Sequence, residues 1–286
     1  MNTPATRPGI RSRLVSLVRS PLRLTARGRT LAICAVPFAA LVAVAALAPL
    51  PMSLAQPGLT ANVLGDNKSK PVITVSGADG RSASREDDGK LLMTTIAATP
   101  PDATVRLPQV LSSWFRTDRA VMPSEAVYPE GETTEEVEKH NQDEMRQSQQ
   151  AAVKAALGQL HRSSRDVRVS LRLADVGGPS AGLLFSLGVI DKIDGDGSGG
   201  GLTGGRTIAG TGTIKADGTV GPVGGVPLKT KAAKRDGASV FLVPKAECAD
   251  AEAELPKGLR LVPVTDLDGA LGALKALRNG GRVPGC

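Results

Sequence analysis

A single serine, Ser180, stands between a proline and two small residues in the stretch VGGPSAGLLFSLGVID, which covers residues 176–191. Proline followed by an apolar run is typical of a helix start, so the stretch predicts a capped helix over 179–193. A serine at such a place can act as a nucleophile, bind a phosphate group at the helix N-terminus, or cap the helix. The surrounding residues leave these three roles open.

A serine hydroxyl becomes a nucleophile only when a neighbouring base takes its proton. The two histidines, His140 and His161, lie on or just after a polar segment with a helical pattern, and we expect both to face solvent. The remaining candidate bases are carboxylates and a lysine kept neutral by burial, because desolvation readily lowers the pKa of lysine. Lys229, in GPVGGVPLKTKAAK, follows a glycine turn and has apolar neighbours. On local evidence alone, a solvated helix face is the more common role for a lysine pair such as Lys229 and Lys231.

Other motifs do not fit a cofactor or metal site. GDGSGG (195–200) satisfies G-x-G-x-x-G, but it follows a helix pattern and runs into more glycine, whereas the dinucleotide fingerprint follows a strand and opens a helix. The same stretch begins like a calcium loop, yet its twelfth position is Gly205 instead of a glutamate. The sequence contains no G-x-x-x-x-G-K-[ST] phosphate loop and no histidine spacing suited to a metal. We therefore expect no cofactor and no metal.

The elements around these residues predict an α/β (α+β) fold, because strand and helix patterns alternate from residue 165 onward. Residues 57–71 have the composition of a loop, and an Asp-Gly pair within 215–221 predicts a hairpin turn. We expect strands at 71–77, 90–98, 166–174, 206–214, 239–244 and 259–264, and helices at 110–118, 133–160, 179–193, 227–238 and 265–279.

Three motifs follow one another along the chain: PSAG at 179–182, TGTI at 211–214, and GPVGG at 221–225, with Lys229 four residues after the last glycine. Together with the patterns that join them, over about 165–280, they resemble the proteolytic domain of Lon proteases. Those enzymes use a serine–lysine dyad on an α/β fold. The resemblance implies that Ser180 is the nucleophile, Lys229 the general base, and Thr211 the residue that lies beside the lysine and holds it.

The backbone amides around Gly178–Ala181 would face the oxyanion that forms when Ser180 attacks a peptide carbonyl, because they lie at a predicted helix start. ATP-dependent Lon proteases often carry an acid immediately before G-P-S-A-G, where this chain has Gly177. Asp175, two residues earlier, is either a substitute for that acid or a surface residue.

The N-terminal segment predicts a membrane anchor. Residues 1–29 carry seven arginines and no acid, and TLAICAVPFAALVAVAALAPL (30–50) is almost wholly apolar. About 20 such residues span a bilayer core of roughly 30 Å. Arginines before the span predict a cytoplasmic N-terminus and an extracytoplasmic body in a single-pass cell-membrane protein. The alternative is a signal peptide, since small residues near Ser53–Ala55 loosely suit a cleavage site.

Those seven arginines account for the net charge of +7, and without them basic and acidic residues are equal in number. Aromatic residues make up only 2% of the chain. A neutral body with few aromatic side chains is a poor nucleic-acid binder, so we expect no nucleic-acid partner. Cys34 lies in the predicted span, whereas Cys248 and Cys286 lie in the body and would be able to pair outside the cytoplasm, the alternative being two free thiols.

The segments LTANVLG, DGKLLMTTIAA and DRAVMPSEAVYPEG, with the polar helix after them, resemble the membrane-anchored, PDZ-containing Lon-like proteases of Gram-positive bacteria. In those proteins a PDZ module follows the long helix, whereas here only HRSSRD (161–166) separates the helix from the PSAG half, so we expect the two halves to pack into one proteolytic domain. The predicted parts are a basic tail at 1–29, a transmembrane anchor at 30–50, an N-terminal part of the body at 57–163, and a Lon-like catalytic part at 164–286.

The sequence therefore predicts an ATP-independent, membrane-anchored serine endopeptidase that cleaves unfolded or exposed segments of proteins and peptides through Ser180 and Lys229. Lon-type domains commonly form hexameric rings, so the resemblance also implies a homo-oligomer. Two alternatives belong to other classes: a catalytically inactive Lon-like binding or scaffold module at the membrane surface, and a small-molecule kinase of a related fold that binds ATP phosphates at a helix start.

Overall fold

The computed structural model describes residues 25–77, 89–128, 133–174 and 176–286. The chain forms two compact units, Met1–Ala48 and Pro49–Cys286. The described part of the first unit is helix α1 (Ala26–Leu47), which is long and apolar enough to cross a membrane. At about 1.5 Å per residue, its 22 residues span roughly the 30 Å of a bilayer core. The helix starts four residues before the start of the predicted anchor (30–50) and ends three residues before its end.

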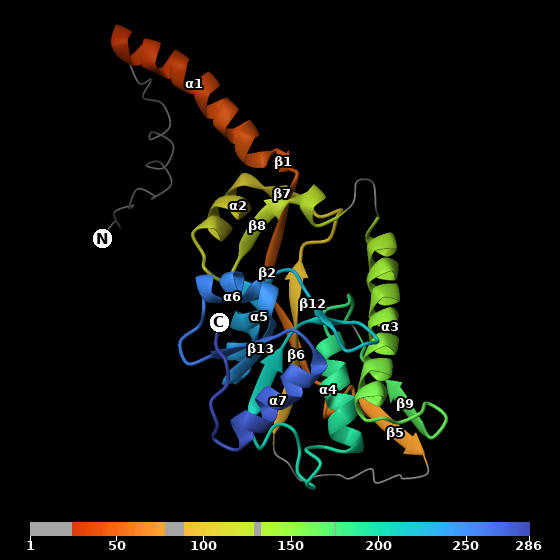
Figure 1. Ribbon diagram of the computed structural model, residues 1–286. Helices are drawn as coiled ribbons and strands as arrows, with labels where there is room; N and C mark the ends of the chain where they lie inside the picture. The colour runs from red at the N-terminus through yellow and green to blue at the C-terminus, as the bar shows by residue number, and fades with distance from the viewer. Residues whose placement is uncertain (1–24, 78–88, 129–132, 175) are drawn as a thin grey trace, which may run out of the picture. The chain divides into compact units, whose positions relative to one another are not determined.

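The second unit is built on a mixed six-stranded sheet with the order β14-β13-β10-β6-β2-β8 (Figure 1). Four neighbouring strands run parallel, and β2 runs antiparallel to both β6 and β8. Strands from both halves of the body lie in this one sheet, so the residues before and after position 164 share one fold. The bounds are β2 (Met52–Asn62), β6 (Lys90–Ala98), β8 (Ala120–Pro123), β10 (Thr207–Gly210), β13 (Val240–Pro244) and β14 (Arg260–Val264).

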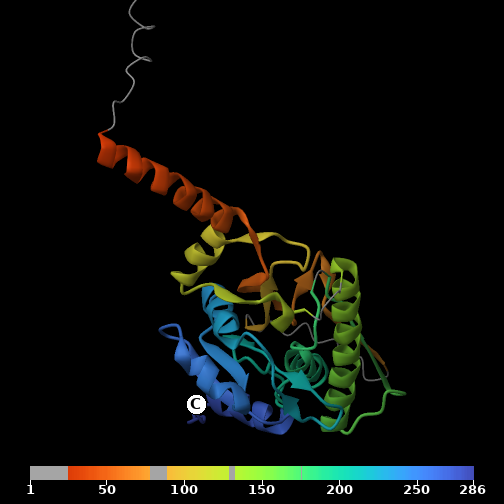
Figure 2. The ribbon, with the colours of Figure 1, turned by 90° about the horizontal axis from the view of Figure 1, so that it is seen from above.

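Helices cover both faces of the sheet because successive side chains of a strand point to opposite faces. On β13, Leu242 contributes to a core cluster with α3 (Thr134–Gln159), α4 (Gly182–Ile193) and α7 (Leu267–Arg278), whereas Phe241 and Val243 contribute to a cluster with α5 (Val226–Arg235) and α6 (Cys248–Ala253). Helix α4 is buried along ten successive residues and lies beside α3 (Figure 2). The predicted α/β fold class is thus confirmed.

The smaller elements complete the unit. Helix α2 (Leu107–Trp114) begins three residues before its predicted position, and the predicted strand 206–214 is divided at Thr211–Gly212. Two short 3₁₀ helices span Ser124–Ala126 and Lys245–Glu247. The remaining strands form two-stranded sheets: β1 (Pro49–Leu50) with β7 (Val105–Arg106), β3 (Asp66–Asn67) with β4 (Lys70–Pro71), β5 (Ile73–Gly77) with β9 (Val167–Leu171), and β11 (Thr213–Ile214) with β12 (Val220–Gly221).

The prediction of a loop at 57–71 is wrong for residues 57–62, because β2 extends to Asn62 and lies inside the sheet. Pro57 and Gly58 are loop signals in a sequence, but here they fall where the register of β2 against β6 shifts between Pro57 and Thr60. Such an irregularity accommodates proline and glycine inside a strand. The pairing partners of β2 come from residues 90–98 and 120–123, so local composition did not reveal the strand.

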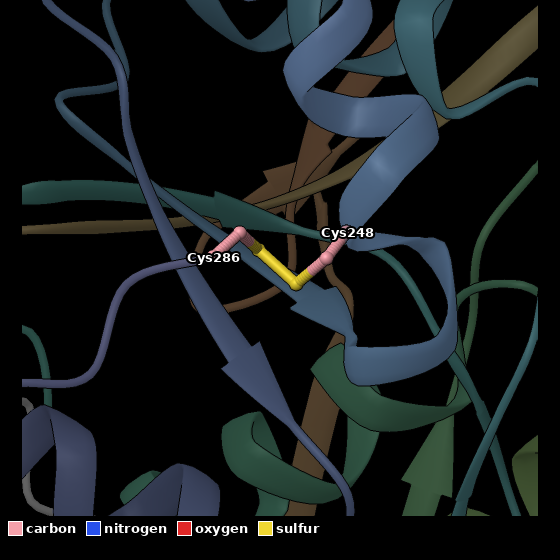
Figure 3. Close-up of a disulfide and its surroundings, with 2 residues drawn as sticks. All are labelled: Cys248 and Cys286. Carbon is pink, nitrogen blue, oxygen red and sulfur yellow. A yellow bond between two sulfur atoms is a disulfide. The ribbon is translucent and has the colours of Figure 1, made fainter.

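A disulfide joins Cys248, at the start of α6, to the C-terminal residue Cys286 (Figure 3). Their Cα atoms are 5.4 Å apart, and the bond closes a loop with a sequence separation of 38. Closing a loop of this length lowers the entropy of the unfolded chain by an amount worth about 4 kcal/mol at 25 °C. The C-terminal segment is also held by Arg260, which donates a hydrogen bond to the carbonyl of Val283.

Candidate active site

Ser180 lies in the turn immediately before α4, and it does not cap that helix. The first helical residue is Gly182 and the N-cap is Ala181, three residues later than the sequence pattern predicted for the helix start. The side chain of Ser180 is partly exposed, and among the described residues its hydroxyl has no hydrogen-bond partner. The hydroxyl is therefore accessible from solvent and not engaged in holding the helix.

Two neighbouring segments hold the serine turn in place. On one side, the carbonyl oxygen of Ser180 accepts hydrogen bonds from the Thr211 hydroxyl at 3.2 Å and from the Gly212 amide at 2.9 Å. On the other side, helix α3 supplies the carbonyl of Asn141, which accepts from the Gly178 amide, and the hydroxyl of Ser148, which donates to the Pro179 carbonyl, both at 2.9 Å. The turn is thereby fixed against two elements distant in the sequence.

The glycines of the serine motif are required either by the backbone conformation of the turn or by close packing. Gly178 has φ of +85°, a left-handed conformation that glycine adopts without steric cost. A Cβ at Gly182 would lie 2.7 Å from the side chain of Ile214 and 3.0 Å from the Ser148 hydroxyl. A Cβ at Gly177 would lie 2.7 Å from the Cβ of Asn141, so an acidic side chain at this position would clash with α3. Asp175, the other candidate for that acid, lies outside the described residues.

Lys229 is buried in the first turn of α5. The N-cap of the helix is Gly225, whose φ of +68° favours glycine. A Cβ at this position would lie 2.8 Å from the side chain of Ile96 in β6, so a larger residue would clash. Lys229 is 3% exposed, and its Nζ donates a hydrogen bond to the Thr211 hydroxyl at 3.2 Å. Thr211 itself is fully buried. The structure therefore connects Lys229 to the Ser180 carbonyl through one threonine hydroxyl.

Burial lowers the pKa of Lys229 from 10.5 to about 8, because a charged ammonium group loses its hydration inside the protein. The negative charge of Glu247, at the end of the 3₁₀ helix before α6, acts in the opposite direction and raises this pKa. A lysine with a pKa near 8 is neutral in a substantial fraction of molecules at mildly alkaline pH. It is thus able to accept a proton, which an ordinary surface lysine does poorly.

The structure brings Ser180, Thr211 and Lys229 into one network, although within the described ranges no hydrogen bond joins the Ser180 hydroxyl directly to Lys229. Catalytic hydrogen bonds are often long in a free enzyme and tighten when substrate binds. Sequence patterns did not reveal the contributions of Asn141, Ser148 and Glu247. Their contacts span 37, 31 and 18 residues of sequence respectively, and no local periodicity reports such contacts.

The glycine-rich stretch GDGSGG (195–200) forms a surface loop that is held by hydrogen bonds within the loop. The carboxylate of Asp196 accepts hydrogen bonds from the amides of Ser198 at 2.7 Å and Gly200 at 2.9 Å, and it pairs with Arg278 of α7. The amides that a phosphate would need are therefore turned toward the loop's own carboxylate. Both histidines are exposed, and over the described parts of the chain no group of three His, Cys, Asp or Glu residues is arranged to hold a metal ion.

Comparison with known proteins agrees with this arrangement. Residues 113–275 match the family described as the Lon protease (S16) C-terminal proteolytic domain. The match covers more than half of the chain and includes Ser180, Thr211 and Lys229, and it makes the domain a serine peptidase in class. More particularly, the chain belongs to the family of Lon C-terminal proteolytic domains, which confirms the resemblance found in the sequence.

A curated relative shows how much of a longer Lon protease this chain matches. The chain is 35% identical over 97 residues to the Lon protease of Chloroflexus aggregans. The aligned part is 32% of this chain but only 11% of that enzyme. The chain thus spans a small fraction of the relative's length, and the similarity concerns the proteolytic domain.

Proposed function

We propose that this protein is a membrane-anchored serine endopeptidase in which Ser180 is the nucleophile and Lys229 the general base. The observation that carries the proposal is the buried Lys229 ammonium group, whose pKa is lowered to about 8 and which is linked through Thr211 to the serine turn. Neutral Lys229 takes the proton from the Ser180 hydroxyl. The resulting alkoxide attacks the peptide carbonyl, the amine leaves after receiving that proton, and water later hydrolyses the acyl-enzyme.

The oxyanion that forms in this reaction needs hydrogen-bond donors at the serine turn. The structure indicates which backbone amides within Gly178–Ala181 are available for this role. The Gly178 amide is already bonded to Asn141, and proline has no N–H. The amides of Ser180 and Ala181 have no acceptor within the described structure, and they stand just before the N-terminus of α4. We assign them the role of oxyanion donors, for which each well-placed amide contributes roughly 3–4 kcal/mol of transition-state stabilisation.

The proposed substrates are extended or locally unfolded segments of proteins and peptides, cleaved without ATP. The absence of a phosphate-binding loop motif from the sequence supports ATP independence. If cleavage proceeds without ATP-driven unfolding, only segments that already adopt an extended conformation would reach Ser180. A homo-oligomer, hexameric by family resemblance, stays a prediction.

The proposed location is the cell membrane, with α1 as a single uncleaved span, the N-terminus in the cytoplasm and the body outside. The arginine-rich segment before α1 supports this orientation, and the Cys248–Cys286 disulfide is typical of an oxidising, extracytoplasmic environment. The residues that would suit signal-peptide cleavage lie inside β2, where Ser53 and Ala55 are 2% and 1% exposed. Cleavage there would remove strand residues that pair with β8.

A fluorescent acylating probe distinguishes a peptidase from an inactive scaffold. The wild-type chain, in detergent or vesicles, should become covalently labelled at Ser180, since Lys229 activates that hydroxyl. The Ser180→Ala variant should remain unlabelled, and mass spectrometry of the labelled peptide should place the adduct within residues 176–191. A wild-type protein that stays unlabelled under conditions that label a known serine–lysine peptidase would favour the scaffold.

The pH dependence of cleavage should follow the protonation of Lys229. Because the neutral lysine is the base, kcat/KM for an unstructured substrate should rise with pH and reach half its plateau near pH 8, the pKa of Lys229. Glu247→Gln removes the charge that raises this pKa, so the midpoint should move to lower pH. Asp250→Asn, which neutralises an exposed acid three residues later, is the control and should leave the midpoint in place. A midpoint that moves upward in Glu247→Gln would contradict the assignment of Lys229 as the base.

A further inference from the structure

Helix α2 exposes an apolar face that the peptidase site does not use. Leu111, Trp114 and Phe115 are 48%, 73% and 85% exposed. Trp114 is the chain's one tryptophan, in a protein with only 2% aromatic residues, and the core phenylalanines Phe185 and Phe241 are fully buried. Large aromatic side chains gathered on a surface mark an interaction site more often than chance exposure.

The exposed face belongs to a helix that is firmly packed on its other side. Val110 and Ser113 are buried, and α2 contacts β7, β8 and β2. Leu111 and Trp114 are three residues apart in the helix, and Phe115 is its C-cap residue four positions after Leu111, so the three side chains lie on the same side of the element. The apolar face is thus held outward by the fold and does not result from a loose segment.

Strand pairing limits how far α2 lies from the end of the membrane helix. Helix α1 ends at Leu47, and β1 begins two residues later with Pro49, which pairs with Arg106, the N-cap residue of α2. Consecutive Cα atoms are 3.8 Å apart and paired strand residues roughly 5 Å. Covalent geometry and this pairing therefore keep the Cα atoms of Leu47 and Arg106 within roughly 13 Å. Figure 1 shows β1, β7 and α2 together at one end of the second unit.

We propose that the outer face of α2 inserts into the interfacial layer of the membrane that α1 crosses. The proposal rests on the anchoring part of the proposed function. Tryptophan prefers the headgroup level, and leucine and phenylalanine insert just below it. Arg106 is exposed at the start of α2, where it would meet anionic lipid headgroups, whereas Arg116 is paired with Asp118 at 2.8 Å.

This second contact would fix the orientation of the peptidase unit. One membrane helix that is joined to a body by a single residue, Ala48, lets that body rotate about the helix end. A helix inserted beside that end resists the rotation, because α2 packs against β8 and β2 of the six-stranded sheet. The candidate active site would then stay at a constant height above the lipid.

Intrinsic fluorescence tests the proposal in the full chain, because all tryptophan emission comes from Trp114. The protein is reconstituted in vesicles of phosphatidylcholine and phosphatidylglycerol, with and without lipids brominated high on the acyl chain. We expect bromolipid to quench Trp114 and iodide in the buffer to quench it only weakly. The double substitution Leu111→Ser with Phe115→Ser should reduce bromolipid quenching and increase iodide quenching several-fold. Leu59→Ser removes a leucine of β2 that is 66% exposed and should change neither.

Each other result overturns the proposal. Strong iodide quenching without bromolipid quenching would place Trp114 in water. Protection from both quenchers would show that a protein surface, from a partner or a second copy, covers α2. Protein that fails to float with the vesicles would overturn the anchor together with this proposal. Failure of bromolipid quenching in vesicles that still cleave substrate would leave the proposed peptidase function standing.

Discussion

Replacing Lys229 with methionine should abolish cleavage and at the same time make the protein more stable at pH 7. Lys229 is buried and its pKa is lowered to about 8, so at pH 7 the folded state contains a mostly charged, poorly hydrated ammonium group. Unfolding returns that group to water. A downward shift from 10.5 to about 8 corresponds to roughly 3 kcal/mol that the folded state loses. Methionine has similar length, carries no charge, and recovers most of this free energy.

The stability difference between the wild type and Lys229→Met should depend on pH. Between pH 8 and 10.5 the unfolded lysine still binds a proton that the folded lysine has released, so the free energy of unfolding of the wild type rises with pH across this window. The Lys229→Met variant lacks that rise, and its advantage should shrink toward zero near pH 10.5. Urea unfolding of both proteins at several pH values between 7 and 10.5 measures the difference.

Lys231→Met is the matched control, two residues along the same helix. Lys231 forms an ion pair with Glu254 and also donates to the Thr117 carbonyl, so its replacement should lower stability and retain cleavage. The assignment of Lys229 as a buried base would fail if Lys229→Met retained cleavage. It would fail equally if the variant were less stable than the wild type at pH 7 with the same pH dependence.

Replacing Ser180 with alanine should lower the rate of cleavage of an unstructured protein by at least about 10⁴-fold, since loss of a nucleophile removes the covalent route. Stability should change by no more than about 0.5 kcal/mol, because the hydroxyl is partly exposed and makes no hydrogen bond within the described structure. The measurement is release of fluorescent peptides from a labelled unfolded protein, with urea unfolding of the same samples.

Ser186→Ala, six residues later on α4, is the control and should affect stability but not cleavage. Ser186 is fully buried, and its hydroxyl donates to the carbonyls of Gly182 at 3.0 Å and Ala152 at 3.2 Å. Its loss should lower stability by about 1 kcal/mol and leave the rate of cleavage nearly unchanged. Equal loss of activity in both variants would mean that the serine turn responds to any disturbance of α4, and would contradict the specific role of Ser180.

Local patterns predicted most elements well and failed where an element depends on distant partners. The long polar run was confirmed as α3, and the apolar strand 239–244 as β13, because helix formers and apolar runs act within a few residues. Strand β2 was missed because Pro57 and Gly58 are acceptable only at the register shift against β6. The split of the 206–214 strand at Thr211–Gly212 likewise follows from the serine turn that packs there.

The sequence by itself determined the chemistry that is available: a serine in PSAG, a lysine after GPVGG, a threonine between them, and an apolar span behind arginines. Tertiary structure decided what that chemistry can do. Whether Lys229 is a base depends on its pKa, and that pKa depends on burial in α5, which packs against β2 and β6 from the first half of the body and β10 from the second. The position of Ser180 likewise depends on Asn141 and Ser148 of α3. Desolvation and packing are properties of the folded chain, since they arise only when residues far apart in sequence exclude water together.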